Sequence, residues 1–466
     1  MSIFTRTVIA ASIVIVNCSS AIAADAPKNI IYLIGDGMAT AHRQVAEYYL
    51  QEKTGNPNAR LAMNSLPVAG INTTHSADSL VTDSAASGTA LAAGVKTNNG
   101  MISMLPDGTK VATLLDGAQA QGKSTGLITT TRLTHATPAA FVANNISRGN
   151  ENEIADDYAT ANVTYVAGGG YRHFVVGKDS KRTDGQDLVA NMEQQDYRTF
   201  VGTESVDSFR GYQPKVGDKV FAAFTKSHTP YELDRMQSDV TPSLAEMTEK
   251  GIELLSKNKN GFFMMIEGGR IDHAAHANDI AGVVYDTLAF DAAVQKALTF
   301  YQQHPEDTLV VITGDHETGG MGMGFGKNYF MTLSQINHAR QSVEDKLQNI
   351  YRGDREAFYR HIAEQFKLND LKSDEKIVIE RAMDAVDNKD PQLGVNYGGY
   401  DPVAIAVAHV TSKRAGVYWT SYAHTATQLP LSAIGVQADE LGGFKDNTEV
   451  AQTLADIMQV KIGKQG

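Results

Sequence analysis

Short apolar runs recur along the chain, and each ends in a polar or glycine-rich cluster. Continuous apolar runs of this kind are typical of strands that are buried on both faces of a sheet. The runs lie at 29–34, 126–129, 262–266 and 309–313. Between them, apolar residues recur with helical spacing at 111–121, 243–255 and 283–299. The alternation predicts an α/β fold with a mainly parallel central sheet, flanked by helices on both faces.

Two segments depart from this rhythm. Residues 321–399 are rich in charge and carry helical patterns, without a strong buried strand. Those patterns lie at 343–351, 355–366 and 376–386. We interpret 321–399 as an insertion that covers the sheet edge or the mouth of a site, and we expect a second insertion at about 171–231. Residues 24–466 are expected to form a single domain that includes both insertions.

The N-terminus has the pattern of a cleavable secretory signal, which we expect at residues 1–23. Arg6 supplies the positive start, residues 8–16 the short apolar core, and residues 21–23 a small-x-small cleavage site. The core is too short to span a bilayer, and no later segment is long enough. We therefore expect a periplasmic or secreted protein without a membrane span.

Composition narrows the range of partners. Cys18 is the only cysteine and lies in the expected signal, so the mature chain would lack disulfides despite an oxidising destination. Cys18 also raises the alternative of a lipoprotein, but the residues before it suit a lipid-attachment signal poorly. The formal net charge is −12, and the absence of a basic cluster argues against nucleic acids or anionic membranes as main partners. An anionic substrate would need a local positive site, which bound cations would provide.

The most informative stretch is 81–90, where an apolar lead-in meets Asp83 and Ser84 and is followed by small residues that can begin a helix. In the first helical turn, Ser84 would lie beside unpaired backbone N–H groups and the positive end of the helix dipole. Both favour an incoming anion, so Ser84 would be well placed to become phosphorylated. The alternative is that Asp83 or Ser84 only caps the helix, and this stretch alone does not separate the two.

The cluster after 262–266 offers metal ligands. A helix that starts near Arg270 would place Asp272 and His276 on one face, because they are four residues apart. A carboxylate and an imidazole on one face make half of a zinc site. Glu267 at the strand end could serve a harder ion such as magnesium. An ordinary polar helix start is the alternative interpretation.

Two more clusters follow predicted strands in the same way. Asp315 and His316 come after 309–313, between glycines that let the backbone turn tightly and approach a ligand. Asp36 closes 29–34, also between glycines, and its two carboxylate oxygens could bridge two cations. Each cluster alone is equally consistent with a polar turn after a strand.

Residues of the predicted loops complete the candidate set. Pro138 suits the first turn of a helix, which would leave His135 and Thr137 in the loop above the sheet. Arg148 could reach back toward His135 from the helix that follows it. Its guanidinium fork matches two phosphate oxygens. The ordinary role of a single arginine is a surface ion pair. His424, near the C-terminus, would be the third ligand of a zinc site that keeps one position open.

Taken together, these motifs resemble the alkaline phosphatase family across essentially the whole mature chain. The ordered motifs are Asp-Gly-Met at 36–38, Thr-Asp-Ser-Ala-Ala at 82–86, Thr-His-Ala-Thr-Pro at 134–138 with the distal Arg148, Glu-Gly at 267–268 with Asp-x3-His at 272–276, Gly-Asp-His-Glu at 314–317 and His-Thr at 424–425. The resemblance implies an alkaline phosphatase-like fold. It also implies hydrolysis of small phosphate monoesters, to inorganic phosphate and an alcohol, through a covalent phosphoserine.

The resemblance also assigns roles. Ser84 would be the nucleophile, Arg148 would bind the non-bridging phosphate oxygens, and Asp83 would orient Arg148. Two zinc ions and one magnesium ion are implied. The first zinc would be held by Asp272, His276 and His424, the second by Asp36, Asp315 and His316, and the magnesium by Asp36, Thr137 and Glu267. The metals answer a physical need, because a phosphate dianion repels nucleophiles unless positive charge surrounds it.

Two positions depart from the well-known enterobacterial pattern of the family. His135 and His273 stand where that pattern has Asp and Lys, and the histidine pair is similar to animal and many marine bacterial members. His135 is then either a direct ligand of the third metal or a group behind its ligands, and the third site could take another metal. His273 is expected to bind or orient the substrate. Residues 321–399 could shape a homodimer interface or the mouth of the pocket.

Other functions remain as alternatives to a phosphomonoesterase. A sulfatase needs its nucleophile in a Cys/Ser-x-Pro-x-Arg context, which Ser84 lacks. A phosphodiesterase usually lacks an arginine clamp suited to a dianion, so Arg148 argues against it. An exported phosphate-binding or zinc-sequestering protein would need the ligands but not the nucleophile.

Overall fold

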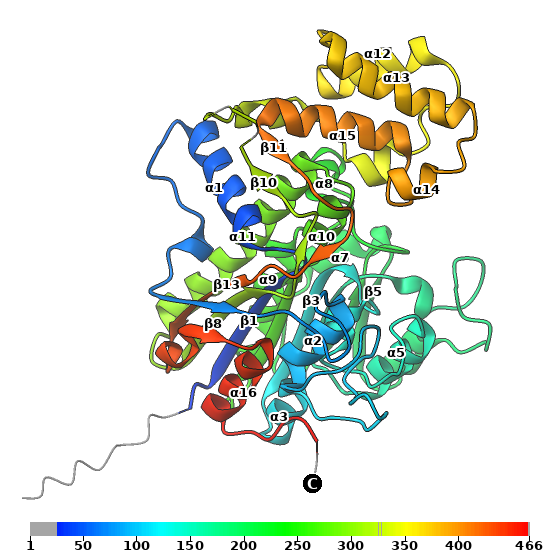
Figure 1. Cartoon of the computed structure of the whole chain (residues 1–466). Coiled ribbons are helices and arrows are strands. Elements are labelled where there is room, and N and C mark those ends of the chain that lie inside the picture. Colours follow the sequence, from blue (N-terminus) through cyan, green and yellow to red (C-terminus); the bar gives the residue numbers. More distant parts are fainter. Residues whose placement is uncertain (1–25, 325, 328, 465–466) are drawn as a thin grey trace, which may run out of the picture.

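A computed structural model describes residues 26–464, apart from 325 and 328, so the expected signal peptide lies outside the described residues. Its centre is a ten-stranded sheet (Figure 1). From edge to edge the strands are β14 (Gly443–Lys445), β2 (Val68–Asn72), β13 (Leu429–Gly435), β8 (Thr308–Gly314), β1 (Asn29–Gly35), β7 (Phe262–Gly268), β3 (Ser124–Arg132), β4 (Tyr165–Gly169), β6 (Lys219–Ala223) and β5 (Tyr197–Val201). Among these ten, β13 alone runs against the rest. The mainly parallel sheet is therefore confirmed.

Strand β1 shows how the apolar runs build the layers. Its side chains alternate across the sheet, so Ile30, Tyr32 and Ile34 join one core cluster and Ile31 and Leu33 the other. The first cluster is shared with α2 (Ser84–Ala93), α3 (Leu114–Ala120), α4 (Ala136–Ala139), α5 (Glu151–Thr160), α6 (Leu188–Glu193) and α16 (Asn447–Met458). The second is shared with α1 (Thr40–Thr54), α7 (Val206–Gly211), α9 (Leu244–Leu255), α10 (Arg270–His276) and α11 (Ile280–Gln303). Helices thus cover both faces, as predicted.

The four strands expected from apolar runs are confirmed as β1, β3, β7 and β8. The expected helices are present as α3, α9 and α11. Residues 171–231 contribute β5 and β6, which extend the sheet at one edge. Strand β2, next to the edge strand β14, and the edge strand β5 were not predicted because exposed and buried positions mix along them, so they lack a continuous apolar run.

The buried apolar side chains of residues 321–399 belong to a third core cluster, which also includes side chains of α1, α8 (Glu232–Ser238) and α11. This segment contains α12 (Arg355–Phe366), α13 (Ser373–Asp387) and α14 (Leu393–Asn396), which group with α15 (Pro402–Ala415) at the top of Figure 1. The helix predicted at 343–351 is instead a five-residue π-helix, η5 (Val343–Leu347). The helix ends at Leu347 because Gln348 leaves the helical region with a ψ of 138° and Asn349 has a φ of 61°, which a right-handed helix cannot include.

Among the described residues, no helix has the length and apolar character needed to cross a membrane. The longest, α11, has 24 residues and carries Asp286, Asp291 and Lys296 within it. Its buried face contacts the sheet and α9. Length alone therefore does not make α11 a membrane span.

The end of β8 offers a test of how tightly the strand ends are packed. Gly314 directly precedes Asp315, and a Cβ on Gly314 would lie 2.4 Å from the carbonyl oxygen of Met38. Because this neighbour is backbone, we expect Gly314→Ala to lower the free energy of unfolding by about 1–3 kcal/mol, measured by urea denaturation. Gly211→Ala at the end of α7 is the matched control, since a Cβ there meets open space. An equal effect of both substitutions would contradict this account.

Candidate active site

Ser84 is the first residue of α2 and Asp83 is its N-cap, so the predicted helix start and cap are confirmed. Asp83 Oδ1 accepts from the Ala86 backbone N–H at 3.0 Å, which caps the helix. Asp83 Oδ2 accepts from Nη1 of Arg148, also at 3.0 Å. Ser84 is buried, and its Oγ lies 3.1 Å from Nε2 of His316.

The carboxylates meet because three neighbouring strands are parallel and in register. Gly35 of β1 pairs with Gly268 of β7 and with Gly314 of β8. Asp36 and Asp315 follow these glycines directly, and Glu267 precedes Gly268, so all three residues lie at one level. This edge is formed by the carboxyl ends of the strands, where ligands collect in open α/β sheets.

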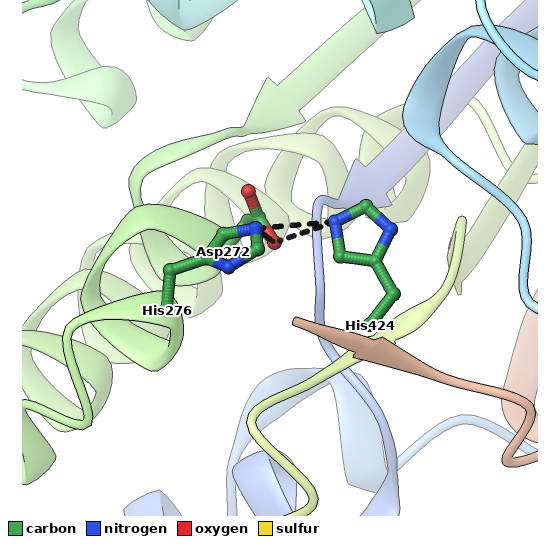
Figure 2. A group of neighbouring side chains, drawn as sticks. All are labelled: Asp272, His276 and His424. Atoms are coloured by element: carbon green, nitrogen blue, oxygen red, sulfur yellow. Dashed lines mark hydrogen bonds and ion pairs between the residues drawn. The ribbon is translucent and has the colours of Figure 1, made fainter. Parts of the chain in front are cut away.

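The described residues contain three groups of side chains that could each hold a metal ion, and the first is Asp272, His276 and His424. Figure 2 shows Asp272 and His276 reaching from α10 toward His424, which comes from β12 (His424–Thr425). The Nε2 atoms of the two histidines are 3.1 Å apart, and they lie 3.4 and 3.6 Å from Asp272 Oδ1. The expected helix start at Arg270 and the shared face of Asp272 and His276 are confirmed.

Backbone carbonyls determine which nitrogen of these two imidazoles carries the proton. Nδ1 of His276 donates to the Tyr422 carbonyl at 2.6 Å, and Nδ1 of His424 donates to the Thr82 carbonyl at 2.8 Å. In a neutral ring, each Nε2 is then left with a lone pair. Two lone pairs and one carboxylate converge on the same point, which is the donor set of a zinc site.

The second group is Asp36, Asp315 and His316. Nε2 of His316 lies 3.2 Å from an oxygen of each carboxylate. Thr318 Oγ1 donates to Asp272 at 2.5 Å and lies 3.2 Å from Nδ1 of His316. Because the only hydroxyl proton of Thr318 goes to Asp272, Thr318 accepts from Nδ1–H, and Nε2 of His316 is left with a lone pair that faces Ser84.

The third group is Asp36, His135 and Glu267. Arg148 Nη2 lies 3.1 Å from Nε2 of His135. An arginine can only donate, so the ring proton of His135 lies on Nδ1, which is 3.8 Å from Asp36. In this tautomer His135 is a hydrogen-bond donor toward the site. Thr137 lies in the first turn of α4 and not in the loop as predicted, because the helix starts at Ala136.

Arg148 also differs in detail from its prediction. It lies in the loop before α5, and not on a helix that follows His135. Its backbone N–H donates to the Gly100 carbonyl at 2.7 Å, and its side chain connects Asp83 with His135. The loop can hold Arg148 near Ser84 because both anchoring contacts come from the segments that flank the site.

Buried polar atoms without hydrogen-bond partners gather at this edge of the sheet. They are both carboxylate oxygens of Asp36, Nδ1 of His135, Oγ1 of Thr137 and Oε1 of Glu267. Such groups are costly unless something satisfies them. An oxygen-rich set around two carboxylates fits a hard divalent cation such as magnesium.

The carboxylates also perturb one another. Burial, followed by the charges of Asp315 and Asp272, raises the pKa of Asp36 well above its usual range. Burial, followed by the charge of Asp272, raises the pKa of Asp315 to about 8. Burial raises the pKa of Glu267 to about 7. Without cations, this cluster therefore holds protons that free carboxyl groups would lose.

Three neighbouring residues were not identified from the sequence. His228, in the loop after β6, has its ring centroid 4.4 Å from that of His273 and 5.8 Å from that of His135. Arg132 donates to His228. Thr318 could have been suspected because it lies two residues after His316, but His228 is a lone histidine with no motif around it.

Stability of the metal-free protein should depend on pH. Asp315 and Glu267 keep protons in the folded state above the pKa of the unfolded groups, so their contribution to stability is lost as pH rises through about 7 to 8. Imidazoles are neutral in both states above pH ~7, so they do not mask the effect. We expect the melting temperature of EDTA-treated protein to fall as pH rises from 7 to about 8 and then to level off, and added zinc and magnesium to reverse the fall. A flat calorimetric profile would contradict this.

Comparison with known proteins agrees with the geometry. The family model described as alkaline phosphatase matches residues 27–460. Alkaline phosphatase 3 of Bacillus subtilis is 32% identical over 451 residues, covering 94% of this chain and 90% of its own length. The structure of Thermus thermophilus alkaline phosphatase has a TM-score of 0.82 at 29% identity, covering 94% of this chain and 93% of the other.

A second similar structure holds a metal. A mutant of the alkaline phosphatase from the Antarctic bacterium TAB5, with magnesium bound in its M3 site, is 25% identical with a TM-score of 0.65. The match covers 94% of this chain and 99% of that one. The family model spans nearly the whole described chain, and the sheet, helices and strand-end clusters lie within it. The chain therefore belongs to the alkaline phosphatase family.

Proposed function

We propose that this alkaline phosphatase-family hydrolase cleaves small phosphate monoesters through a covalent phosphoserine at Ser84, with two zinc ions and one magnesium ion in its site. One observation carries the proposal: Ser84 Oγ, at a helix N-terminus, lies 3.1 Å from a histidine that also lies beside two of the buried carboxylates. A mere anion-binding site would not need a nucleophile there.

Ser84 is prepared for attack by its neighbours. His316 Nε2 accepts the hydrogen bond of the Ser84 hydroxyl. When Asp36, Asp315 and His316 hold a zinc ion, this lone pair would bind the ion instead, and the charge of the ion would favour loss of the Ser84 proton. The Oγ–P bond forms as the P–O bond to the alcohol breaks. The Ser84 hydroxyl gives its proton to water, and the leaving alcohol takes one proton from water, so the protons balance. A water molecule then attacks phosphorus and releases inorganic phosphate and free Ser84.

Arg148 would bind the non-bridging oxygens of the phosphate. Asp83 accepts from Nη1 and His135 from Nη2, so the guanidinium plane is fixed before substrate arrives. Preorganised donors cost little reorganisation at the moment of reaction. Asp83 would thus serve as both helix cap and orienting group for Arg148.

The ligand groups support three cation sites. Asp272, His276 and His424 would hold the first zinc ion, and Asp36, Asp315 and His316 the second. Asp36, Thr137 and Glu267 would hold magnesium, with His135 donating a hydrogen bond from behind these ligands. The ions would supply positive charge at the entering and leaving oxygens and favour ionisation of the Ser84 hydroxyl. The magnesium in the TAB5 relative supports a metal at the third site.

We further propose that the protein acts in the periplasm or outside the cell, after removal of residues 1–23. The charged, apolar and small-residue regions of that segment support export. The acidic net charge of −12 and the polar cluster at the sheet edge suit a small anionic substrate that binds through cations.

Ser84→Ala tests covalent catalysis. We expect metal content to remain, burst-phase phosphorylation to disappear and kcat on p-nitrophenyl phosphate to fall by at least about 10³-fold, because no other nucleophile occupies that position. Ser256→Ala, on the exposed end of α9, is the control. Unchanged turnover in the Ser84 variant would exclude a phosphoserine mechanism, and normal metal binding without any wild-type turnover would favour a binding protein.

Arg148→Ala tests the preference for monoesters. The loss of charge-assisted hydrogen bonds should raise the KM for p-nitrophenyl phosphate by about 10- to 100-fold. The KM for the singly charged bis-p-nitrophenyl phosphate should rise much less. Arg198→Ala on β5, where Arg198 stacks on Tyr212, is the control. A wild-type preference for the diester would contradict the proposed function.

A further inference from the structure

Arg270 is a buried charge that the proposed chemistry does not use. It is the first residue of α10 and is 2% exposed. Its Nη1 lies 3.1 Å from Nδ1 of His273, and its Nη2 donates to Asp345 at 2.6 Å. A buried charge without partners is costly, and here His273 and Asp345 lie against the two Nη atoms. Arg270 therefore connects His273 to the segment at 321–399.

The guanidinium is held from several sides. Its Cζ lies 3.6 Å from the ring centroid of Tyr231, in cation–π geometry. The Tyr231 hydroxyl donates to Glu344, which is also 3.9 Å from Arg270 Nη1. An aromatic face and two carboxylates leave the Arg270 side chain little freedom to turn away from His273.

The acidic pair is itself anchored to the domain. Glu344 and Asp345 belong to η5, whose first residue Val343 donates its N–H to Asp279 Oδ2 at 2.9 Å. The preceding Ser342 donates from its N–H and its hydroxyl to Asp234, at 3.0 and 2.6 Å. Asp279 caps α11 and Asp234 lies in α8, so η5 is fixed to two helices.

We propose that Arg270, set by Glu344 and Asp345, is a positioning residue that holds His273 in the tautomer with its proton on Nε2. Arginine has five N–H donors and no acceptor, so the contact at Nδ1 requires a lone pair there. In the neutral ring, the proton must then lie on Nε2. The ring of His273 lies 5.6 Å from that of His135, between centroids, which places it beside the third group of ligands.

The consequence for the site rests on the proposed function. A His273 fixed as an Nε2–H donor can give a hydrogen bond to a phosphate oxygen or to a water beside it. A ring free to exchange tautomers would offer that donor only part of the time. Residues 343–347, far from the nucleophile in sequence, would therefore control the affinity for phosphate through Arg270.

Arg270→Met and Arg270→Lys in the metal-loaded protein test the proposal. In wild type labelled with ¹⁵N-histidine, we expect the His273 signals, assigned with His273→Asn, to show an unprotonated Nδ1 and a protonated Nε2. Arg270→Met should mix the two tautomers and weaken inorganic phosphate binding by about tenfold, while metal content stays unchanged. KM for p-nitrophenyl phosphate should rise more than kcat falls. Arg270→Lys, which still donates, should recover part of both effects.

A folded Arg270→Met protein with the wild-type His273 tautomer and phosphate affinity would overturn the proposal. Should that variant fail to fold, Asp345→Asn takes its place in the test. It keeps Arg270 and should shift the His273 signals in the same direction, and unshifted signals would overturn the proposal. Its matched control is Asp384→Asn, whose carboxylate also lies 2.6 Å from an arginine, Arg355, on the exterior of the same segment. An inactive wild type would refute the proposed function instead, since the tautomer signals do not depend on turnover.

Discussion

The in-register pairing of β8, β1 and β7 is the constraint on which the site depends. It brings Asp36, Glu267 and Asp315 to one buried edge, where their charges repel one another. Buried like charges are unfavourable unless protons or cations neutralise them. The fold thus creates a need for cations at the position where a phosphate ester needs positive charge. One packing arrangement thus supports both the metal binding and the substrate binding that we propose.

Hydrogen bonds around this edge have a consistent direction. Carbonyls or a threonine hydroxyl take the Nδ1 protons of His276, His424 and His316, so each Nε2 faces inward as an acceptor. His135 and His273 instead accept hydrogen bonds from arginines. The proton of each of these rings therefore lies on the other nitrogen, away from the arginine. The neighbours of each imidazole, and not the imidazole itself, thereby distinguish a metal ligand from a hydrogen-bond donor.

Residues 321–399 do more than cover the surface, because their apolar side chains form the third core cluster together with other helices. Its helices pack against α1, α8 and α11, and η5 reaches α10, which also carries Asp272 and His276. The contact between Asp345 and Arg270 is the one through which, in our proposal, this charged, helical segment affects the site. Because α10 has only seven residues, a shift of Arg270 would also displace Asp272 and His276.

The sequence by itself determined the layered fold and most candidate ligands. Local patterns carry that information: an apolar run marks a buried strand, and a polar cluster after it marks the carboxyl edge. The sequence also suggested Asp83 as a helix cap and as a partner of Arg148, and the structure shows both contacts. The tertiary structure alone decided that Thr137 lies inside α4 and that His228 and Arg270 lie beside the site. His228 contacts Arg132 across 96 residues and Arg270 contacts Asp345 across 75 residues, and no local pattern specifies the direction of a side chain across such a distance.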